Sequence, residues 1–212
     1  MQKVTIKDYG IGNILSVARA FEYCGANVLL ADSAEKIADA DYLILPGVGA
    51  FADGMAGLME RKLVEPIKTF IAKERPFLGI CLGMQMMLDE SEEFGSHKGL
   101  GLIPGKVIAI SAVGSDGASH KIPHIGWNEI SMPESTSWKN TILAEISEWT
   151  PFYFVHSFTV IPEQQQHRLA DCDYNGVLIS AAIKNENIYG FQFHPEKSGE
   201  AGLRVVAAFL RF

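Results

Sequence analysis

The strongest constraint on the fold is an alternation of short apolar runs with helical patterns over the first 90 residues. The apolar runs have the length and composition of buried strands, and apolar side chains at helical spacing follow them. Strands are expected at residues 4–7, 28–30, 42–45 and 77–80, and helices at 13–23, near 35–38, and at 52–61, 66–73 and 82–88. This order predicts a doubly wound α/β fold, with helices on both faces of a parallel sheet. Sites in such sheets gather at the carboxyl ends of the strands.

Strand patterns dominate after about residue 99. They are expected at 107–110, 127–130, 152–155, 158–161, 177–183 and 188–193, with a closing helix at 198–209. Ser115-Asp116-Gly117 is the clearest hairpin signal among the connecting turns. Because no Pro- or Ser-rich linker separates the two halves, we expect the second half to extend the same sheet with antiparallel strands. Residues 1–212 are therefore expected to form one domain.

Composition excludes several classes of function. The 212 residues are 48% apolar and 20% charged, so the chain can bury a core and is not expected to be disordered. The net charge of −7 and the lack of a basic run argue against nucleic-acid binding, and against a site for a multiply phosphorylated substrate built by this chain alone. No apolar segment is long enough to span a membrane. The N-terminus lacks an apolar signal core, and the three cysteines include no CxxC, so a reducing, cytoplasmic location is expected.

The stretch Gly79-Ile80-Cys81-Leu82-Gly83 lies between an apolar strand run and a helical pattern. Gly-x-Cys-x-Gly in this position is the nucleophile-elbow pattern, with cysteine in place of serine. The glycines leave room for a strained turn that holds the sulfur at a helix N-terminus, where the helix dipole favours a thiolate. The N–H of Leu82 would then point toward a developing oxyanion. A buried structural cysteine is the alternative interpretation.

His194 is the best candidate among six histidines for the base that such a thiol needs. It follows the strand run at 188–193, and Glu196 lies two residues further on. A carboxylate there could orient the imidazole and stabilise its cation. The chain order Cys81, His194, Glu196 matches a catalytic triad. Because spacing alone does not prove contact, a surface His-Pro turn beside an unrelated glutamate remains the alternative.

Two glycine-rich turns after strands have both functional and plain structural interpretations. Pro46-Gly47-Val48-Gly49 lacks the full pattern of a phosphate-binding loop, but Val48 could supply a backbone N–H to an oxyanion hole. The turn from Asp8 to Asn13 could contact a ligand or only reverse the chain. His120 and His124 have helical spacing, but Pro123 disfavours a regular helix between them, so no zinc site is expected.

Taken together, the elbow with Met84-Gln85 and the His194-Pro195-Glu196 sequence resemble the class I (triad) glutamine amidotransferases. Five motifs narrow the resemblance to the glutaminase subunits of imidazole glycerol phosphate synthase. These motifs are Asp8-Tyr9-Gly10 through Asn13, Leu45-Pro46-Gly47-Val48-Gly49-Ala50-Phe51, Pro123-His124-Ile125-Gly126-Trp127-Asn128, Tyr153-Phe154-Val155-His156-Ser157 and His194-Pro195-Glu196-Lys197-Ser198. The match runs almost from end to end. It implies a flavodoxin-like, doubly wound mixed sheet, mostly parallel, with an antiparallel extension in the C-terminal half.

The resemblance also implies roles for the matching residues. Cys81 would attack the side-chain amide of L-glutamine, giving a γ-glutamyl thioester and ammonia, while His194 moves protons and Glu196 holds His194. The oxyanion hole would comprise Gly47, Val48, Gly49 and Leu82. The residues that hold glutamine would be Gln85, Glu93, His156 and Ser157. The residues that face the partner, a (β/α)8-barrel cyclase in a heterodimer, would be Asn13, Trp127, Tyr153 and Lys197. Neither a cofactor nor a metal ion is implied.

Some positions depart from the family pattern. Phe158 stands where tyrosine is usual, Phe191 where valine is common, and the segment 113–120 looks specific to a subgroup. These departures leave open a paralogous glutaminase that feeds ammonia to another barrel, for example for amidine formation in surface-polysaccharide biosynthesis. A cysteine hydrolase or peptidase and a non-catalytic binding module are the alternatives from other classes. Because two glycines at 47 and 49 would let the oxyanion peptide flip, we expect the isolated chain to be a poor glutaminase.

Overall fold

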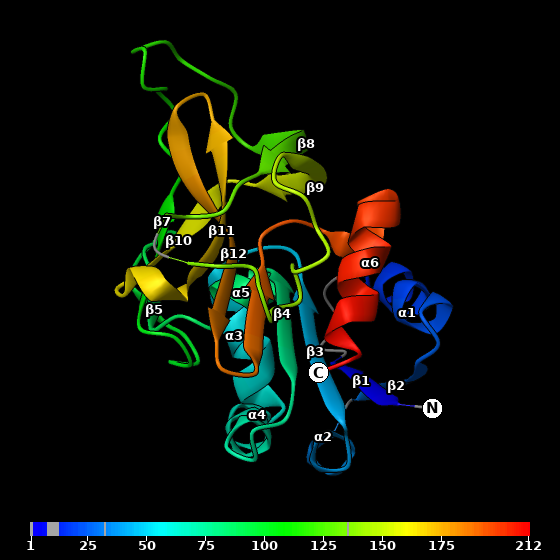
Figure 1. The fold of residues 1–212 in the computed structure, drawn as a ribbon. Coiled ribbons are helices and arrows are strands. Elements are labelled where there is room, and N and C mark those ends of the chain that lie inside the picture. Colours follow the sequence, from blue (N-terminus) through cyan, green and yellow to red (C-terminus); the bar gives the residue numbers. More distant parts are fainter. Residues whose placement is uncertain (1, 8–12, 32, 135) are drawn as a thin grey trace.

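A seven-stranded mixed sheet forms the centre of the molecule (Figure 1). The computed structural model describes residues 2–7, 13–31, 33–134 and 136–212, so the expected turn from Asp8 lies outside the described residues except for Asn13. The sheet has the order β11-β12-β13-β4-β3-β1-β2. Its strands are β1 (Lys3–Lys7), β2 (Asn27–Ala31), β3 (Tyr42–Gly47), β4 (Phe77–Cys81), β11 (Arg168–Tyr174), β12 (Val177–Asn185) and β13 (Ile188–Phe191).

Neighbouring strands from β13 to β2 run parallel, and β12 and β11 are added antiparallel at one edge. The predicted mostly parallel sheet with an antiparallel extension is therefore confirmed. The sequence reasoning missed β11, because charged residues such as Asp171 and Asp173 interrupt its apolar pattern.

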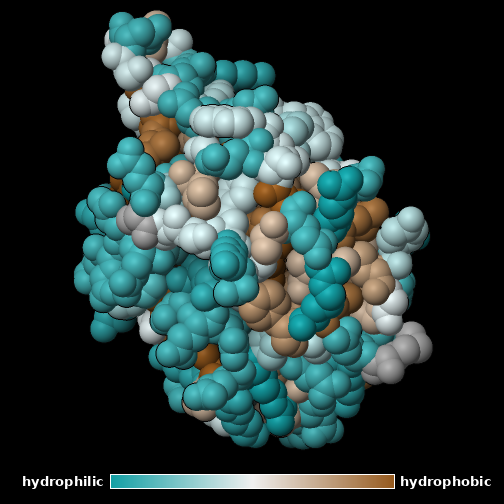
Figure 2. Space-filling model, viewed as in Figure 1, coloured by the Kyte–Doolittle hydropathy of each residue, from teal (hydrophilic) through white to brown (hydrophobic). Residues whose placement is uncertain are grey.

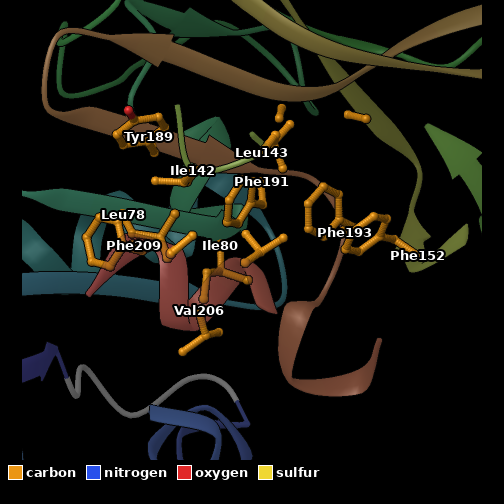
Figure 3. Packing of buried hydrophobic residues seen from close by; sticks show 14 of the residues in the cluster. Leu78, Ile80, Ile142, Leu143, Phe152, Tyr189, Phe191, Phe193, Val206 and Phe209 are labelled. Carbon is orange, nitrogen blue, oxygen red and sulfur yellow. The ribbon is translucent and has the colours of Figure 1, made fainter. Parts of the chain in front are cut away.

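Helices cover both faces of this sheet, as the strand–helix alternation predicts (Figure 1). Successive residues of a strand point to opposite faces: Ile44 joins one apolar cluster, while Leu43 and Leu45 join the other. The first cluster lies under α1 and α6, and Figure 3 shows side chains of α6 packed against those of β4. The second lies under α3 and α4. The α-helices are α1 (Ile14–Tyr23), α2 (Ala34–Ala38), α3 (Phe51–Glu60), α4 (Val64–Ile71), α5 (Leu82–Gln85) and α6 (Gly199–Phe209), and the 3-10 helices are η1 (Gln165–His167) and η2 (Pro195–Lys197).

Two helix predictions were wrong in detail. The helix expected at 82–88 ends at Gln85, because the next backbone bonds, from Met87 and Leu88, reach back three residues instead of four. The helix expected to begin at Pro66 begins two residues earlier, at Val64. Proline is tolerated there because the first four N–H groups of a helix have no partner within it.

The strands between residues 90 and 162 do not join the main sheet, which corrects the expectation that the whole second half extends it. A four-stranded sheet has the order β10-β7-β5-β6, and a two-stranded ribbon pairs β8 with β9. These strands are β5 (Glu90–Ser91), β6 (His97–Lys98), β7 (Gly105–Ala109), β8 (His124–Ile130), β9 (Thr150–His156) and β10 (Phe158–Pro162).

The segment between β7 and β8 projects beside the β11–β12 turn (Figure 1). A bridge between Val113 and Ser119 and a positive φ of 79° at Gly117 confirm the predicted hairpin turn. Figure 2 shows that the tip of this projection is covered mostly by hydrophilic and neutral residues. Among the described residues, no helix has the length and apolar character needed to cross a membrane.

Candidate active site

Cys81 lies on a strained turn between β4 and α5. Its backbone has φ 54° and ψ −112°, a conformation that a side-chain-bearing residue rarely adopts. Both flanking glycines are required by space: a Cβ on Gly83 would lie 1.7 Å from the carbonyl oxygen of Leu45, and one on Gly79 would lie 2.7 Å from the Gly83 carbonyl group. The structure therefore has the elbow that the Gly-x-Cys-x-Gly sequence predicts.

The structure brings His194 and Glu196 into contact. Nδ1 of His194 lies 2.8 Å from Oε1 of Glu196, and the two side chains are only 4% and 2% exposed. Both follow β13, which is the parallel neighbour of β4, so they lie at the carboxyl ends of the strands, as Cys81 does. Nε2 of His194 has no hydrogen-bond partner among the described residues.

Burial on its own would lower the pKa of His194. The charge interaction with Cys81 and the hydrogen-bonded carboxylate of Glu196 act in the opposite direction and raise that pKa to about 9. The imidazole is therefore protonated at neutral pH, beside the sulfur. A protonated imidazole in this position can give its proton to a leaving amine.

A cavity of about 360 Å³ opens in front of Cys81. It gathers most of the expected oxyanion and glutamine residues, together with four that sequence reasoning did not assign. The expected residues in its wall are Val48, Gly49, Leu82, Gln85, Glu93, His156 and Ser157. The unassigned ones are Phe94, Pro123, Val155 and Phe158. Gly47 is not in this wall, but it is the strand neighbour of Cys81 across β3 and β4.

Glu93 connects the cavity wall to the glycine-rich loop. Its Oε2 accepts a hydrogen bond of 2.6 Å from the backbone N–H of Phe51, the first residue of α3. A carboxylate at a helix N-terminus is favoured by the helix dipole. Since α3 begins directly after the Gly47–Gly49 turn, Glu93 anchors the segment expected to form the oxyanion hole.

Gln192 is a site residue that sequence reasoning missed. It is fully buried, and its Nε2 lies 3.7 Å from Sγ of Cys81. Its Oε1 accepts a hydrogen bond of 3.1 Å from Nε2 of Gln85. The available signal was a polar side chain within the apolar run 188–193, because a buried amide needs hydrogen-bond partners.

Three of the four residues expected to face a partner lie together on the surface beside the triad. The rings of Trp127 and Tyr153 meet edge to face at 6.2 Å, and Nζ of Lys197 lies 5.6 Å from the centre of the Tyr153 ring. Trp127 is 57% exposed. The carbonyl of Tyr153 accepts a hydrogen bond from the backbone N–H of His194. Asn13 precedes α1, which packs against η2, the helix that contains Glu196.

Within the described parts of the chain, no three histidine, cysteine, aspartate or glutamate side chains gather where they could hold a metal ion. His124 lies instead in the buried interior, 3.0 Å from His156.

The sequence matches a family model over residues 5–211, and that model describes the class I glutamine amidotransferases. A relative in Legionella pneumophila (strain Lens), imidazole glycerol phosphate synthase subunit HisH 1, is 57% identical over 212 residues, which cover 100% of both chains. The HisH subunit of Syntrophotalea carbinolica is 42% identical and covers 97% of this chain and 98% of its own length.

Two solved structures have the same fold. PurLQS from Thermotoga maritima superposes with a TM-score of 0.73 at 20% identity, covering 99% of this chain and 98% of that one. A crystal structure described as a glutamine amidotransferase gives a TM-score of 0.71 at 14% identity, covering 98% of this chain and 97% of the other.

Proposed function

The chain belongs to the class I glutamine amidotransferase family, and on that premise we propose that Cys81, His194 and Glu196 are its catalytic triad. It acts as the glutaminase of imidazole glycerol phosphate synthase in histidine biosynthesis. The observation that best supports the triad is the strained elbow at Cys81, which faces a cavity and lies beside the buried His194–Glu196 pair.

The triad hydrolyses glutamine in two steps. The sulfur of Cys81 attacks the side-chain amide carbon of glutamine, the C–N bond breaks, and His194 gives its proton to the departing ammonia. His194 then takes a proton from a water molecule that attacks the γ-glutamyl thioester, which releases glutamate and restores the thiolate. Glu196 holds the imidazole and stabilises its cation.

The developing oxyanion is stabilised by backbone N–H groups, which we assign to Leu82 and to the Gly47-Val48-Gly49 turn. Leu82 is the first residue of α5, so its N–H has no partner within that helix. Glutamine occupies the cavity in front of Cys81, against Gln85, Glu93, His156 and Ser157.

The chain works as one subunit of a heterodimeric synthase whose other subunit is a cyclase. We propose that this cyclase is a (β/α)8 barrel and that it covers Trp127, Tyr153, Lys197 and Asn13. Their position beside His194 supports this assignment, because ammonia released there would pass into the partner without entering bulk water, where it would be protonated. We also propose that residues 1–212 form one glutamine amidotransferase domain. The cytoplasmic location stays a prediction.

The test is Cys81→Ala in the complex with the cyclase subunit that co-purifies with the chain. Glutamine-dependent synthase turnover should vanish, while added ammonium salts still support the cyclase reaction. Glutamine-dependent turnover that survives in Cys81→Ala would refute the triad, and loss of both activities would refute the assignment as glutaminase of this synthase. A co-purified partner from another pathway would instead support the paralogous glutaminase.

A further inference from the structure

His124 has no role in the mechanism above, yet it is buried directly behind the glutamine cavity. It begins β8, opposite His156 at the end of β9. Its Nδ1 lies 3.0 Å from Nε2 of His156. Its ring is stacked between the rings of Phe154 and Tyr174, with centroid distances of 4.9 and 4.1 Å. This stacking restricts rotation of the imidazole.

The hydrogen bonds determine which nitrogen of each histidine carries a proton. Nδ1 of His156 lies 2.8 Å from the carbonyl oxygen of Phe158, which can only accept, so that nitrogen is a donor. Burial lowers the pKa of His156 to about 3 and that of His124 to about 4, so both rings are neutral at pH 7. A neutral imidazole carries one N–H, which leaves Nε2 of His156 as an acceptor. His124 must therefore donate from Nδ1.

The last acceptor in this chain of hydrogen bonds is the carbonyl oxygen of Phe158, the first residue of β10. The carbonyl of Phe158 also accepts a hydrogen bond of 3.3 Å from Nε2 of Gln85. Ser157 and Phe158 both line the cavity in front of Cys81. If the donor on His124 is removed, the buried Nε2 of His156 is left as an acceptor without a donor, while Nδ1 keeps its hydrogen bond to the Phe158 oxygen. Because an unsatisfied buried acceptor costs free energy, His156 and the residues that follow it would move to find another partner.

We propose that His124 is a positioning residue for the glutamine site: its Nδ1–H satisfies Nε2 of His156 and thereby holds residues 156–158 in place for the substrate. This inference rests on the proposed function of the cavity. His124 acts only through His156 and does not touch the reacting atoms. The property that matters is a hydrogen-bond donor at the position of Nδ1.

Two substitutions distinguish the effect of this hydrogen-bond donor from the effect of the aromatic ring that carries it. His124→Phe keeps an aromatic ring between Phe154 and Tyr174 but removes the donor. His124→Asn loses the ring but places an amide N–H near the position of Nδ1. Each variant is assayed in complex with the cyclase subunit for the KM and kcat of glutamine hydrolysis. Co-elution of the two subunits in size-exclusion chromatography reports whether the complex is assembled.

We expect His124→Phe to raise the KM for glutamine about tenfold or more, because a buried acceptor loses its donor. We expect kcat to change much less, and His124→Asn to keep KM within about threefold of the unmodified complex. A normal KM in His124→Phe, or equal damage in both variants, would overturn the proposal. If the unmodified complex hydrolyses no glutamine, the proposed function of the site fails instead.

A second measurement does not depend on the folding of any variant. ¹⁵N NMR of histidine-labelled chain in the unmodified complex distinguishes the two neutral tautomers of each imidazole. We expect His156 and His124 both to carry hydrogen on Nδ1. Hydrogen on Nε2 of His156 would overturn the proposal whatever the kinetics show.

Discussion

Replacing Glu196 with glutamine tests whether the negative charge of Glu196 raises the pKa of His194. Glutamine keeps an oxygen that can accept the Nδ1–H bond seen at 2.8 Å, so the substitution removes the charge and preserves the shape. Raising the pKa of His194 from 6.5 to about 9 corresponds to about 3 kcal/mol. Burial works against this rise, so Cys81 and Glu196 together contribute at least that much. Removing one of the two partners should cost roughly half, about 1.5 kcal/mol, or about tenfold in proton affinity.

The assay is an NMR titration of the His194 ring in the complex, together with the pH dependence of glutamine hydrolysis. In Glu196→Gln we expect the His194 midpoint to fall by about one pH unit or more and kcat/KM at neutral pH to fall about tenfold or more. Glu200→Gln is the matched control, because Glu200 pairs with Arg204 on the surface. It should leave the His194 midpoint unchanged.

The sign of the stability effect follows from the same shift. The folded-state pKa of His194 is raised, so its contribution to stability is fully present below about pH 6.5 and is lost as pH rises through about 9. Denaturant unfolding should therefore show Glu196→Gln less stable than the unmodified chain at pH 6, with the difference shrinking by pH 10. An unchanged His194 midpoint, or a difference that grows toward pH 10, would refute the reasoning.

Four further outcomes are expected. Gly83→Ala should abolish glutamine hydrolysis and reduce the folded yield, because the new Cβ would overlap the backbone of Leu45. Gly54→Ala is the control: its Cβ meets only side-chain atoms, so it should lower the free energy of unfolding far less. Gln192→Leu should slow alkylation of Cys81 by iodoacetamide about tenfold, because the thiolate loses an N–H donor, and an unchanged rate would count against that contact. The isolated chain should hydrolyse glutamine far more slowly than the complex. Trp127→Ala should weaken subunit binding, measured by calorimetry, by about 2 kcal/mol or more. Full activity without the partner, or unchanged affinity, would contradict these expectations.

The central sheet could be predicted because its strands are buried on both faces and are therefore continuous apolar runs. The β11 strand could not, since Asp171 and Asp173 interrupt its apolar pattern and its pairing depends on β12. The short length of α5 could not be predicted either. The helical pattern in the sequence continues beyond Gln85, but the next backbone hydrogen bonds reach back three residues instead of four.

The candidate site shows the same division. The elbow at Cys81 and the sequence around His194 are local patterns, so spacing was enough to locate them. Gln192 contacts Cys81, which lies 111 positions away in the sequence, and His124 contacts His156, which lies 32 positions away. Such contacts exist only once the chain has folded. A buried polar residue within an apolar run was the available signal for Gln192.

In the mechanism that we propose, Cys81 carries the γ-glutamyl group during turnover. Rapid acid quenching of the complex with glutamine, followed by proteolysis and mass spectrometry, measures this directly. We predict a glutamyl adduct on the peptide that contains Cys81, and none in Cys81→Ala. Glutamine turnover with no adduct on that peptide, or an adduct on Cys24 or Cys172 instead, would show that Cys81 is not the nucleophile.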